Sequence, residues 1–341
     1  MDGVYTQTNE AERNEVVAFR RAADGRLAPV GRYETGGKGT GKPHLPSQSS
    51  LALSGDGRWL LVANSGSDDL SVFAVAEEGL SLSDRVHSGG TAPMSVAEHD
   101  GLVYVLNTGG ESPNITGFRI DADGRASMLD GSTRPLSSDA ADPAQIQFSP
   151  DGTALVATER GTDSISTYAI GPDGYAEGPV TIPSKGATPY GFDFRGDGAL
   201  VVTEAFGGEV GAAAASSYLL GGSQLEAVSG SVRNTRSEVC WAVVGKDGRY
   251  AYVTNFGDGT VSRYALADDG ALELVDPVAA STTPGEKGVR DESLTPDGRF
   301  LYAIDADAQK VFGWRVQEDG TLSSVGDFDG LPATVAGLAA G

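Results

Sequence analysis

Basic side chains gather in polar segments that separate short apolar runs of the sequence. They stand out because the chain has only 25 Lys and Arg residues against 47 Asp and Glu residues. Guanidinium and ammonium groups attract a carboxylate or phosphate and stabilise negative charge that develops on an oxygen atom. The segments predict either a cationic rim that binds a small organic acid or a polar surface that only keeps the protein soluble. Their basic residues are Lys38, Lys42, His44, Arg134, Arg160, Lys185, Arg233, Arg236, Lys287 and Arg290.

His44, in the segment KPHLPSQS, is the histidine best placed for chemistry among the three in the chain. His87 lies near the end of an apolar run, and His99 adjoins an Asp-Gly pair. An imidazole with its ordinary pKa of about 6.5 can act as a general base in a hydrolysis or can shuttle a proton in a ring closure. The alternative is that His44 is an ordinary loop residue.

Acidic, amide and aromatic side chains lie at the ends of the same apolar runs. Glu159 and Glu204 each follow such a run, and a carboxylate there could accept or donate a proton during a reaction. Glu292 and Asp305 belong to the same group of acids. The side chains that we expect to contact a bound molecule are Gln48, Gln145, Tyr190, Trp241, Asn255 and Asp291.

Most motifs of catalysis and metal binding are missing. The chain has no G-x-S-x-G, H-E-x-x-H or P-loop pattern. Cys240, in the apolar run VCWAVV, is the only cysteine, so an internal disulfide is excluded and a buried, unreactive thiol is expected. Asp121 and Asp305 begin fragments of a calcium-loop pattern, but the ligands that should follow are absent, which favours ordinary turns. We therefore expect neither a metal nor a cofactor.

Charge and hydropathy narrow the range of partners. The formal net charge is −22, whereas a nucleic-acid binder needs a basic surface that neutralises phosphates. No apolar stretch approaches the roughly 18–20 residues of a membrane helix. The opening residues MDGVYTQTNEAERNE do not form a signal segment, so we expect a cytoplasmic protein, or a secreted one if a signal peptide has been removed. We expect a monomer that binds a small organic acid or a lactone.

A repeated pattern indicates how these residues are positioned. Six segments share an apolar strand, an Asp-Gly turn, a second apolar strand, a loop and a third strand that ends near an aromatic residue. A spacing of about 44–51 residues is the length of one four-stranded propeller blade. The Asp-Gly turns begin at Asp56, Asp100, Asp151, Asp197, Asp247 and Asp297.

A seventh blade is divided between the two ends of the chain. The segment DGVYTQTN from Asp2 resembles DGRYAYVTN from Asp247, which is the second strand of a blade. LPATVAGLAAG, from Leu331, resembles an innermost strand, and the pairing of Pro332–Ala339 with Gly3–Thr8 would cover two free strand edges. We therefore predict one all-β domain, a seven-bladed β-propeller closed by its C-terminal strand. The predicted blades span 1–36 with 331–341, then 47–90, 91–137, 142–185, 187–231, 237–281 and 288–330.

In such a ring, the loops that enter the innermost strands share one face with the loops between the second and third strands. The candidate residues lie in these loops, around the expected mouth of the central channel, where ligand sites are common. The Asp-Gly turns lie on the opposite face. They carry Arg58, Arg249 and Arg299 there, which reduces the charge difference between the two faces.

The repeats resemble those of the lactonase-family propellers, which include 6-phosphogluconolactonase and the carboxymuconate-cyclase-like proteins. The resemblance covers nearly the whole chain and rests on strings such as SPDGTALVATERGTDSISTYAI and KDGRYAYVTNFGDGTVSRYAL. It is specific for the fold and less specific for the chemistry, because one blade template serves both enzymes and binding scaffolds. Metal-binding gluconolactonases have six blades, and a count of seven argues against their metal site.

The resemblance also implies site residues. Family lactonases use His, Arg and Glu side chains at the channel mouth, and their innermost strands often begin with Pro-Arg-His or Pro-His-His. In this chain Arg290 matches the arginine, while Asp291 stands in place of the histidine. The loop Glu159-Arg160-Gly161 resembles the family's Asn-Arg-Gly loop, and Glu204 matches its Asn-Glu loop. The histidine is missing from the innermost strands that we align with this pattern, and the order of these elements along the chain differs from that of 6-phosphogluconolactonase.

These observations favour a lactonase-type enzyme that hydrolyses a lactone, or that cyclises or isomerises an unsaturated acid. Arg160 and Arg290, with His44, would then bind and polarise the carbonyl or carboxyl oxygen, and Glu159 or Glu204 would move the proton. The alternative is a non-catalytic propeller that binds a protein partner or an acidic metabolite at the same mouth. A further alternative is a structural propeller outside the cell.

Overall fold

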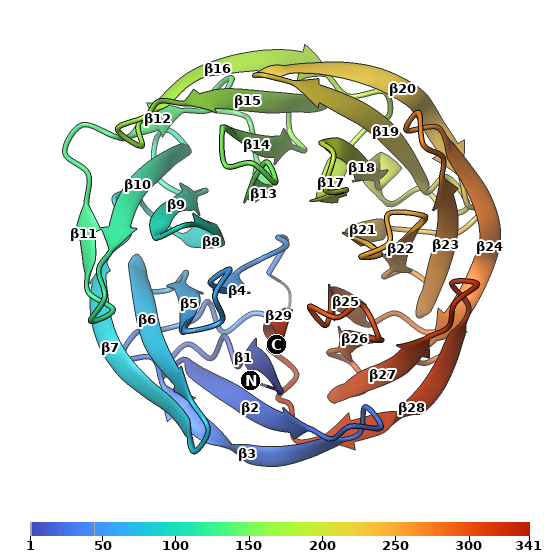
Figure 1. The fold of residues 1–341 in the computed structure, drawn as a ribbon, viewed down its shortest axis with the longest axis horizontal. Helices are drawn as coiled ribbons and strands as arrows, with labels where there is room; N and C mark the ends of the chain where they lie inside the picture. The colour runs from blue at the N-terminus through green and yellow to red at the C-terminus, as the bar shows by residue number, and fades with distance from the viewer. Residues whose placement is uncertain (1, 44) are drawn as a thin grey trace.

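A ring of antiparallel sheets forms the protein, six of them with four strands and one with five, and Figure 1 shows the sheets arranged around a common centre. The computed structural model describes residues 2–43 and 45–341, and in these residues seven sheets, or blades, are present. The predicted seven-bladed β-propeller is confirmed. No helix among the described residues is long and apolar enough to cross a membrane.

Each blade contributes one strand to the wall of the channel and one strand next to it. In order from the first blade to the seventh, the innermost strands are β29 (Ala336–Ala340), β4 (Leu51–Leu53), β8 (Pro93–His99), β13 (Pro143–Phe148), β17 (Pro189–Phe194), β21 (Val239–Val244) and β25 (Val289–Leu294). In the same order, the second strands are β1 (Gly3–Gln7), β5 (Trp59–Asn64), β9 (Leu102–Asn107), β14 (Ala154–Glu159), β18 (Ala199–Glu204), β22 (Tyr250–Asn255) and β26 (Phe300–Asp305).

The two outer strands of each blade form the rim of the ring. The third strands are β2 (Glu15–Arg21), β6 (Asp69–Ala76), β10 (Asn114–Ile120), β15 (Ser164–Ile170), β19 (Ala214–Gly221), β23 (Thr260–Leu266) and β27 (Lys310–Val316). The outermost are β3 (Leu27–Glu34), β7 (Gly79–His87), β11 (Ala126–Met128) with β12 (Arg134–Pro135), β16 (Ala176–Pro183), β20 (Gln224–Arg233), β24 (Leu272–Ser281) and β28 (Leu322–Asp329). A short 3-10 helix, η1 (Phe206–Gly208), follows β18.

Apolar side chains between neighbouring blades form the core. The second strands are buried on both sides because each is covered by two other blades, and every residue of β14 and β18 is buried. Between the third and fourth blades, for example, Tyr104, Ile146, Leu155 and Tyr168 pack together. The outermost strands instead alternate between exposed and half-buried residues, as β20 does, because only one of their sides faces the protein.

The ring closes through the C-terminal strand, as predicted. β29 pairs antiparallel with β1, and the N–H of Gly341 donates to the carbonyl of Gly3 over 2.7 Å. Leu338 packs into the core between the first and seventh blades. The closing strand begins at Ala336 rather than at Pro332. Figure 1 shows the two termini side by side at the inner edge of the first blade.

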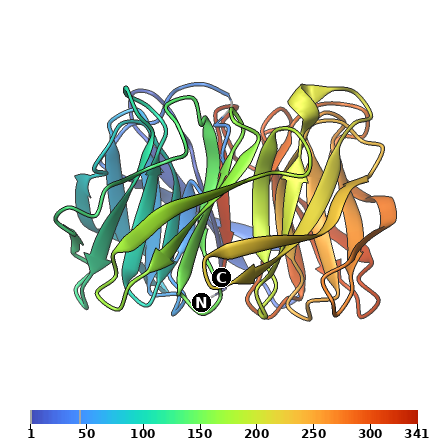
Figure 2. The same ribbon diagram turned by 90° about the horizontal axis from the view of Figure 1, so that it is seen from above.

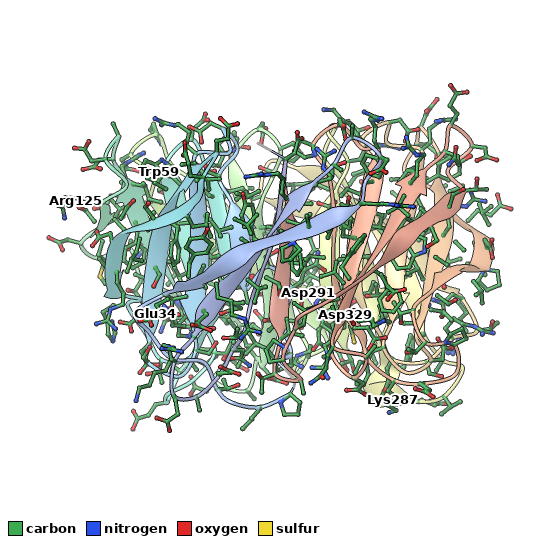
Figure 3. All side chains as sticks on the ribbon, turned by 90° about the horizontal axis from the view of Figure 1, so that it is seen from below. Glu34, Trp59, Arg125, Lys287, Asp291 and Asp329 are labelled. Atoms are coloured by element: carbon green, nitrogen blue, oxygen red, sulfur yellow. The ribbon has the colours of Figure 1, made fainter. Side chains whose placement is uncertain are left out.

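The two faces of the ring differ in their loops. One face, here called the Asp-Gly face, carries the turns between the first and second strands, together with both termini. The other, the loop face, carries the loops that enter the innermost strands, and Figure 2 shows η1 there. In Figure 3, Trp59 lies toward the Asp-Gly face, Lys287 lies at the loop face and Asp291 lies between them.

A β-bulge lies near the start of several innermost strands. The pairing register shifts between Pro143 and Gln145 in the fourth blade and between Val289 and Glu292 in the seventh. The fifth and sixth blades have shifts at the same place. A bulge adds a residue to one strand and breaks the strict alternation of side chains. Adjacent residues at this point can therefore both lie beside the channel, which unbroken alternation would forbid.

Candidate functional site

The segment 45–50, just before the second blade, enters the channel from the loop face, and Figure 1 shows it reaching the centre of the ring. Its residue Gln48 donates from Nε2 to the carbonyl of Ala242 over 2.8 Å and accepts from the N–H of Ala242 at Oε1 over 3.1 Å. The indole N–H of Trp241 donates to the carbonyl of Ser47 over 3.0 Å. The segment is thus fixed to the sixth blade, on the other side of the channel from the blade that it enters.

Gln145 makes the same kind of bridge between the fourth and fifth blades. Its Nε2 donates to the carbonyl of Phe192 over 2.9 Å, and its Oε1 accepts from the N–H of Phe192 over 2.6 Å. Both amide ends are therefore engaged with backbone, and the side chain is buried. Gln48 and Gln145, which were predicted to contact a ligand, both connect strands of the ring in this structure.

A group of mostly buried side chains lies at the loop-face end of the channel. We call it the loop-face cluster, and Tyr190 lies at its centre. The Arg160 guanidinium carbon lies 5.0 Å from the centroid of the Tyr190 ring, and the Trp241 ring lies 5.6 Å away on a tilted plane. The Arg290 guanidinium carbon lies 5.1 Å from the centroid of Phe256. The cluster consists of Arg160, Tyr190, Cys240, Trp241, Phe256 and Arg290.

The cluster brings together two arginines that lie far apart in the sequence and belong to different blades. Arg160 follows β14 in the fourth blade, and Arg290 lies at the bulge of β25 in the seventh. Burial raises the pKa of the Tyr190 hydroxyl well above its ordinary value, while both guanidinium groups oppose that increase. The same two arginines oppose the increase that burial causes in the pKa of the Cys240 thiol. Both positive charges therefore act on one small volume.

Tyr190 contributes a hydroxyl group with unused hydrogen-bonding capacity. Its side chain is 4% exposed, and the hydroxyl has no hydrogen-bond partner among the described residues. Because its raised pKa keeps it protonated, the hydroxyl is available as a donor to an oxygen atom of a bound molecule. Cys240 is held close by a weak contact from Sγ to the carbonyl of Glu238 over 3.3 Å, and its raised pKa keeps it a thiol.

Arg160 is held in place from the surface side. Its Nη2 donates to Oδ1 of Asp142 over 2.7 Å, and its Nε donates to the Asp142 carbonyl over 3.2 Å. The Arg160 side chain is 13% exposed, so it connects the buried cluster with solvent. At the outer edge of the same region, the ammonium group of Lys287 pairs with Glu238 over 2.8 Å.

Asp291 lies between the loop-face cluster and the interior of the channel. Its Oδ2 accepts from the N–H of Gly337 over 3.1 Å, while its Oδ1 has no hydrogen-bond partner among the described residues. Burial raises the pKa of this carboxyl to about 7, against the lowering effect of the Arg290 charge. Near neutral pH the group is thus divided between its acidic and basic forms, as a general base requires.

Glu159 and Glu204, predicted at the channel mouth, are instead buried inside their own blades. Glu159 accepts hydrogen bonds from Ser166 Oγ over 2.5 Å and from Thr162 Oγ1 over 2.9 Å. Glu204 accepts from the N–H of Gly186 over 2.8 Å and from Ser231 Oγ over 2.7 Å. These contacts connect each blade's second strand with its outer strands and with the segment that enters the blade. The structure does not bring either carboxylate into the loop-face cluster.

Asn255 lies at the corresponding position of the sixth blade. Its Oδ1 accepts from Nδ2 of Asn234 over 2.8 Å, and its Nδ2 donates to Ser262 Oγ over 2.9 Å. The same position in the seventh blade is Asp305, which accepts from Thr282 Oγ1 over 2.6 Å. The location predicted for Glu159, Glu204, Asn255 and Asp305 was wrong. Each lies at the end of a second strand, and its side chain bonds to groups of the blades rather than facing the channel.

Other candidates from the sequence lie elsewhere. His44 lies outside the described residues. Arg134 donates to the carbonyl of Ala176 over 2.7 Å at the outer rim, and Arg233 lies over the ring of Phe206. The carboxylate of Asp121 accepts two backbone N–H groups within its own turn. Among the described residues, no group of three or more acidic, histidine or cysteine side chains is arranged to hold a metal ion.

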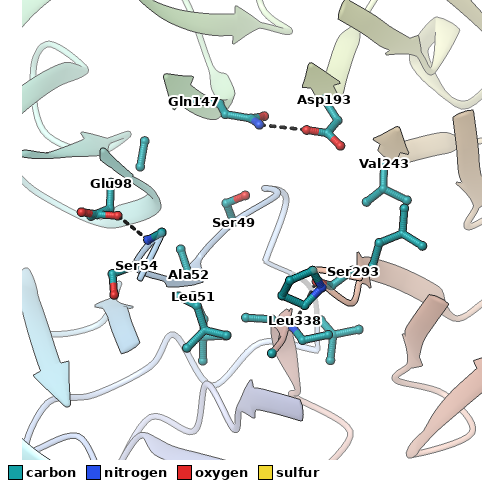
Figure 4. Close-up of a pocket in the computed structure, with 18 of the residues that line it drawn as sticks. Ser49, Leu51, Ala52, Ser54, Glu98, Gln147, Asp193, Val243, Ser293 and Leu338 are labelled. Carbon is teal, nitrogen blue, oxygen red and sulfur yellow. Dashed lines mark hydrogen bonds between the residues drawn. The ribbon is translucent and has the colours of Figure 1, made fainter. Parts of the chain in front are cut away.

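The main cavity of the channel opens on the Asp-Gly face, whereas the sequence placed the mouth on the loop face. It has a volume of about 840 Å³, and Gln48, Ser49 and Asp291 form its inner end. Figure 4 shows Gln147 and Asp193 on its wall, joined by a hydrogen bond of 2.8 Å. The sequence carried a signal for Asp193, since an acid stands within the otherwise apolar innermost strand YGFDF.

Comparison with known proteins agrees with this architecture. The family model of the lactonase seven-bladed β-propellers matches residues 4–133, 125–205 and 202–334. A segment of 83 residues is 39% identical to 6-phosphogluconolactonase of Serratia proteamaculans; it covers 23% of this chain and only 25% of that relative.

Two solved structures have the same fold over nearly their whole length. The periplasmic gluconolactonase of Pseudomonas aeruginosa aligns with a TM-score of 0.73 and 18% identity, covering 97% of each chain. A protein from Lactobacillus plantarum aligns with a TM-score of 0.77 and 18% identity, covering 99% of this chain and 98% of the other. The family match extends through all seven blades, and the chain therefore belongs to the lactonase family of seven-bladed β-propellers.

Proposed function

We propose that the protein hydrolyses a small lactone at the loop-face cluster. The observation that carries the proposal is the convergence of the Arg160 and Arg290 charges on the buried Tyr190 hydroxyl. Positive charge and a hydroxyl donor in a desolvated site are suited to stabilise negative charge on a carbonyl oxygen. Membership of the lactonase family and the partial match to a 6-phosphogluconolactonase point to the same class of substrate.

In the proposed reaction, the carbonyl oxygen of the lactone accepts hydrogen bonds from Arg290 and from the Tyr190 hydroxyl. The carboxylate of Asp291 removes a proton from water, and the resulting hydroxide adds to the carbonyl carbon. The bond between this carbon and the ring oxygen then breaks, and protonated Asp291 returns its proton to the leaving alkoxide. The product is a hydroxy acid, whose new carboxyl group releases its proton to solvent and remains beside Arg160 as a carboxylate.

Asp291 can take the role that the family pattern gives to a histidine. An aspartate in water has a pKa far below 7 and is a poor base, but burial raises the pKa of Asp291 to about 7. This value is close to that of an ordinary imidazole. The sequence predicts that Asp291 contacts a bound molecule, and its Oδ1, unpartnered among the described residues, supports the more specific role of general base.

The proposal is tested by measuring acid release from a panel of lactones in a pH-stat. The panel contains γ-butyrolactone, δ-gluconolactone and 6-phosphogluconolactone, which differ in ring size and charge. The Arg160→Ala/Arg290→Ala double variant gives the background that includes spontaneous hydrolysis. We expect at least one lactone to be opened at least 100-fold faster by the wild-type protein than by the double variant.

Unsaturated dicarboxylic acids are assayed in parallel by their ultraviolet absorbance, because the same groups could support the reverse ring closure. Turnover of such an acid without turnover of any lactone would mean that the protein catalyses ring closure rather than hydrolysis. Equal rates for the wild-type and double-variant proteins on all compounds would overturn the catalytic proposal. The non-catalytic binding propeller would then be the better interpretation.

A further inference from the structure

The channel cavity on the Asp-Gly face is lined by none of the residues of the loop-face cluster, although Asp291 borders both. Its volume of about 840 Å³ is within the usual range for small-molecule sites. The walls combine carboxyl groups with apolar side chains that include Leu51, Val243 and Leu338. Figure 4 shows Val243, Asp193 and Leu338 around the same space.

Three carboxyl groups lie on the cavity wall: those of Asp291 and Glu292 belong to buried residues, and that of Asp193 to a half-buried one. Neither carboxylate oxygen of Glu292 has a hydrogen-bond partner among the described residues, and the same is true of Oδ1 of Asp291. Asp193 accepts only from neutral donors, the side chain of Gln147 over 2.8 Å and the N–H of Val244 over 2.7 Å among them. The acids thus offer unused acceptor capacity on the wall of the cavity.

The position of Glu292 is unusual among the blades of this chain. The registers of the blades place it at the level of Ile146, Phe192 and Ala242, which are apolar residues packed between blades. A carboxyl group there costs stability unless a ligand or a proton neutralises it. A role of the Glu292 carboxyl group in ligand binding would account for this cost in stability.

The charges that face the cavity are mostly negative. Lys246 is a basic residue at its rim, and its ammonium group donates to the carbonyl of Pro296 over 2.5 Å. His99 lines the same rim and contacts Asp100. The acidic residues on the lining are Asp56, Glu98, Asp193, Asp291 and Glu292. A small cation would therefore enter a field of the opposite charge.

We propose that the channel cavity binds a small alkylammonium ligand, whose N–H groups donate to Asp193, Asp291 and Glu292 and whose aliphatic part lies against Val243 and Leu338. An ammonium group has three donors and no acceptor, which matches a wall of unpartnered carboxylate oxygens. The apolar wall suits a short carbon chain. A bare metal ion fits less well, because the described acids are not grouped at metal-ligand spacing.

Binding in this site is coupled to the release of protons. Burial raises the pKa of all three carboxyl groups, and Asp193 and Asp291 repel the negative charge of Glu292. A bound ammonium group favours the ionised carboxylates, so the protein gives up protons when the ligand binds. The affinity for an alkylammonium ion therefore rises between pH 6 and pH 8, whereas that for a neutral analogue stays nearly constant.

Isothermal titration calorimetry with n-pentylamine and 1,5-diaminopentane tests the proposal, with 1-pentanol as the neutral analogue. We expect saturable binding at one site, and affinity at least tenfold lower in the Asp193→Asn/Glu292→Gln double variant. The matched control is Asp142→Asn, which removes a carboxylate from the loop face and should leave the affinity unchanged. Equal losses in both variants would mean general attraction to an acidic surface and would overturn the proposal.

Methyl NMR of the wild-type protein provides a second test that does not depend on the folding of a variant. Titration with n-pentylamine should shift the methyl signals of Leu338 and Val243, while those of Val210 on the loop face should not move. An absence of shifts at Leu338 and Val243, or of saturable binding by either amine, would overturn the proposal. Because Arg160→Ala leaves the cavity intact, it should keep the amine affinity even if it loses lactone hydrolysis.

Discussion

Gln48 and Ala242 lie 194 residues apart in the chain and pair through two hydrogen bonds across the channel. The amide of Gln48 satisfies a backbone N–H and a backbone carbonyl of the sixth blade, although its own segment leads into the second. Buried backbone groups need such partners, because water cannot reach them freely. The interaction thus fixes the segment between the loop-face cluster and the channel cavity.

Replacing Gln48 by alanine should destabilise the protein measurably. The substitution leaves the N–H and the carbonyl of Ala242 without their side-chain partner, and such losses typically cost about 1–3 kcal/mol. We expect the free energy of unfolding, measured by urea titration, to fall by about 2 kcal/mol. Gln224→Ala, on an exposed outer strand, is the control and should change it little. Equal stability of the two variants would show that the bridge contributes nothing.

Removing the closing strand should have a larger effect. Deletion of 335–341 takes away the partner of β1 and removes Leu338 from the core between the first and seventh blades. The exposed edge of β1 should then promote association between molecules. We expect a clearly lower melting temperature and aggregates in size-exclusion chromatography. An unchanged melting curve for the truncated protein would contradict a stabilising role of the closure.

The fold could be predicted from the sequence because its signals are local and repeated. Each Asp-Gly pair marks a tight turn, and Asp151 shows why: its Oδ1 accepts from Ser149 Oγ and from the N–H of Thr153, while Gly152 takes a positive φ of 69°. The regular spacing of such turns gives both the length and the number of the blades. The first blade could also be predicted, because each end of the chain carries only part of a repeat and the two parts complete one another.

The site could be predicted only in part, because side-chain direction depends on contacts that are distant in sequence. From the alternation of side chains along a strand, one can predict that Glu159 points to the opposite side from its neighbours. One cannot predict that Ser137 and Ser166 donate hydrogen bonds to it. The bulge in β25 changes which residues face the channel, so Asp291 and Glu292 both line the cavity. Strict alternation would place Arg290 and Asp291 on opposite sides of this strand, and the bulge lets both lie beside the channel.

Replacing Glu292 by glutamine should stabilise the protein at alkaline pH. Burial raises the pKa of this carboxyl in the folded state. The protonated carboxyl therefore contributes its full stabilisation of the folded state below the unfolded pKa of about 4.5, and this stabilisation is lost as the pH rises toward the folded pKa. Each pKa unit of difference corresponds to about 1.4 kcal/mol. We expect the free energy of unfolding to fall less between pH 5 and pH 8 in Glu292→Gln than in the wild type.

The exposed residue Glu226 provides the control for this comparison, since Glu226→Gln makes the same chemical change on the outer strand β20. Its pH profile of stability should follow that of the wild type. If Glu292→Gln also followed the wild-type profile, the carboxyl of Glu292 would have to be ionised in the folded protein without penalty. That result would contradict its burial without a hydrogen-bond partner among the described residues.

The rate of lactone hydrolysis should depend on the ionisation of Asp291. The proposed base is the carboxylate, which is present above a pKa of about 7 and is lost as the pH falls below it. We expect kcat/KM to rise with pH and to level off above about pH 8. Asp291→Asn should lower kcat by at least about 100-fold and remove this pH dependence. A variant that kept both the rate and its pH dependence would exclude Asp291 as the base.

Arg290 should contribute to the transition state more than to stability. A charge-assisted hydrogen bond to a developing oxyanion is typically worth about 2–4 kcal/mol, or roughly 30–1,000-fold in rate. Arg290→Ala and Arg290→Met should each lose this factor in kcat/KM for the lactone that the panel identifies. The methionine variant keeps much of the buried aliphatic volume against Phe256, so its melting temperature should stay close to that of the wild type. Arg249→Ala, on the Asp-Gly face, is the control and should keep full activity. Full activity in Arg290→Met would make Arg290 a structural residue and would favour the binding propeller over the enzyme.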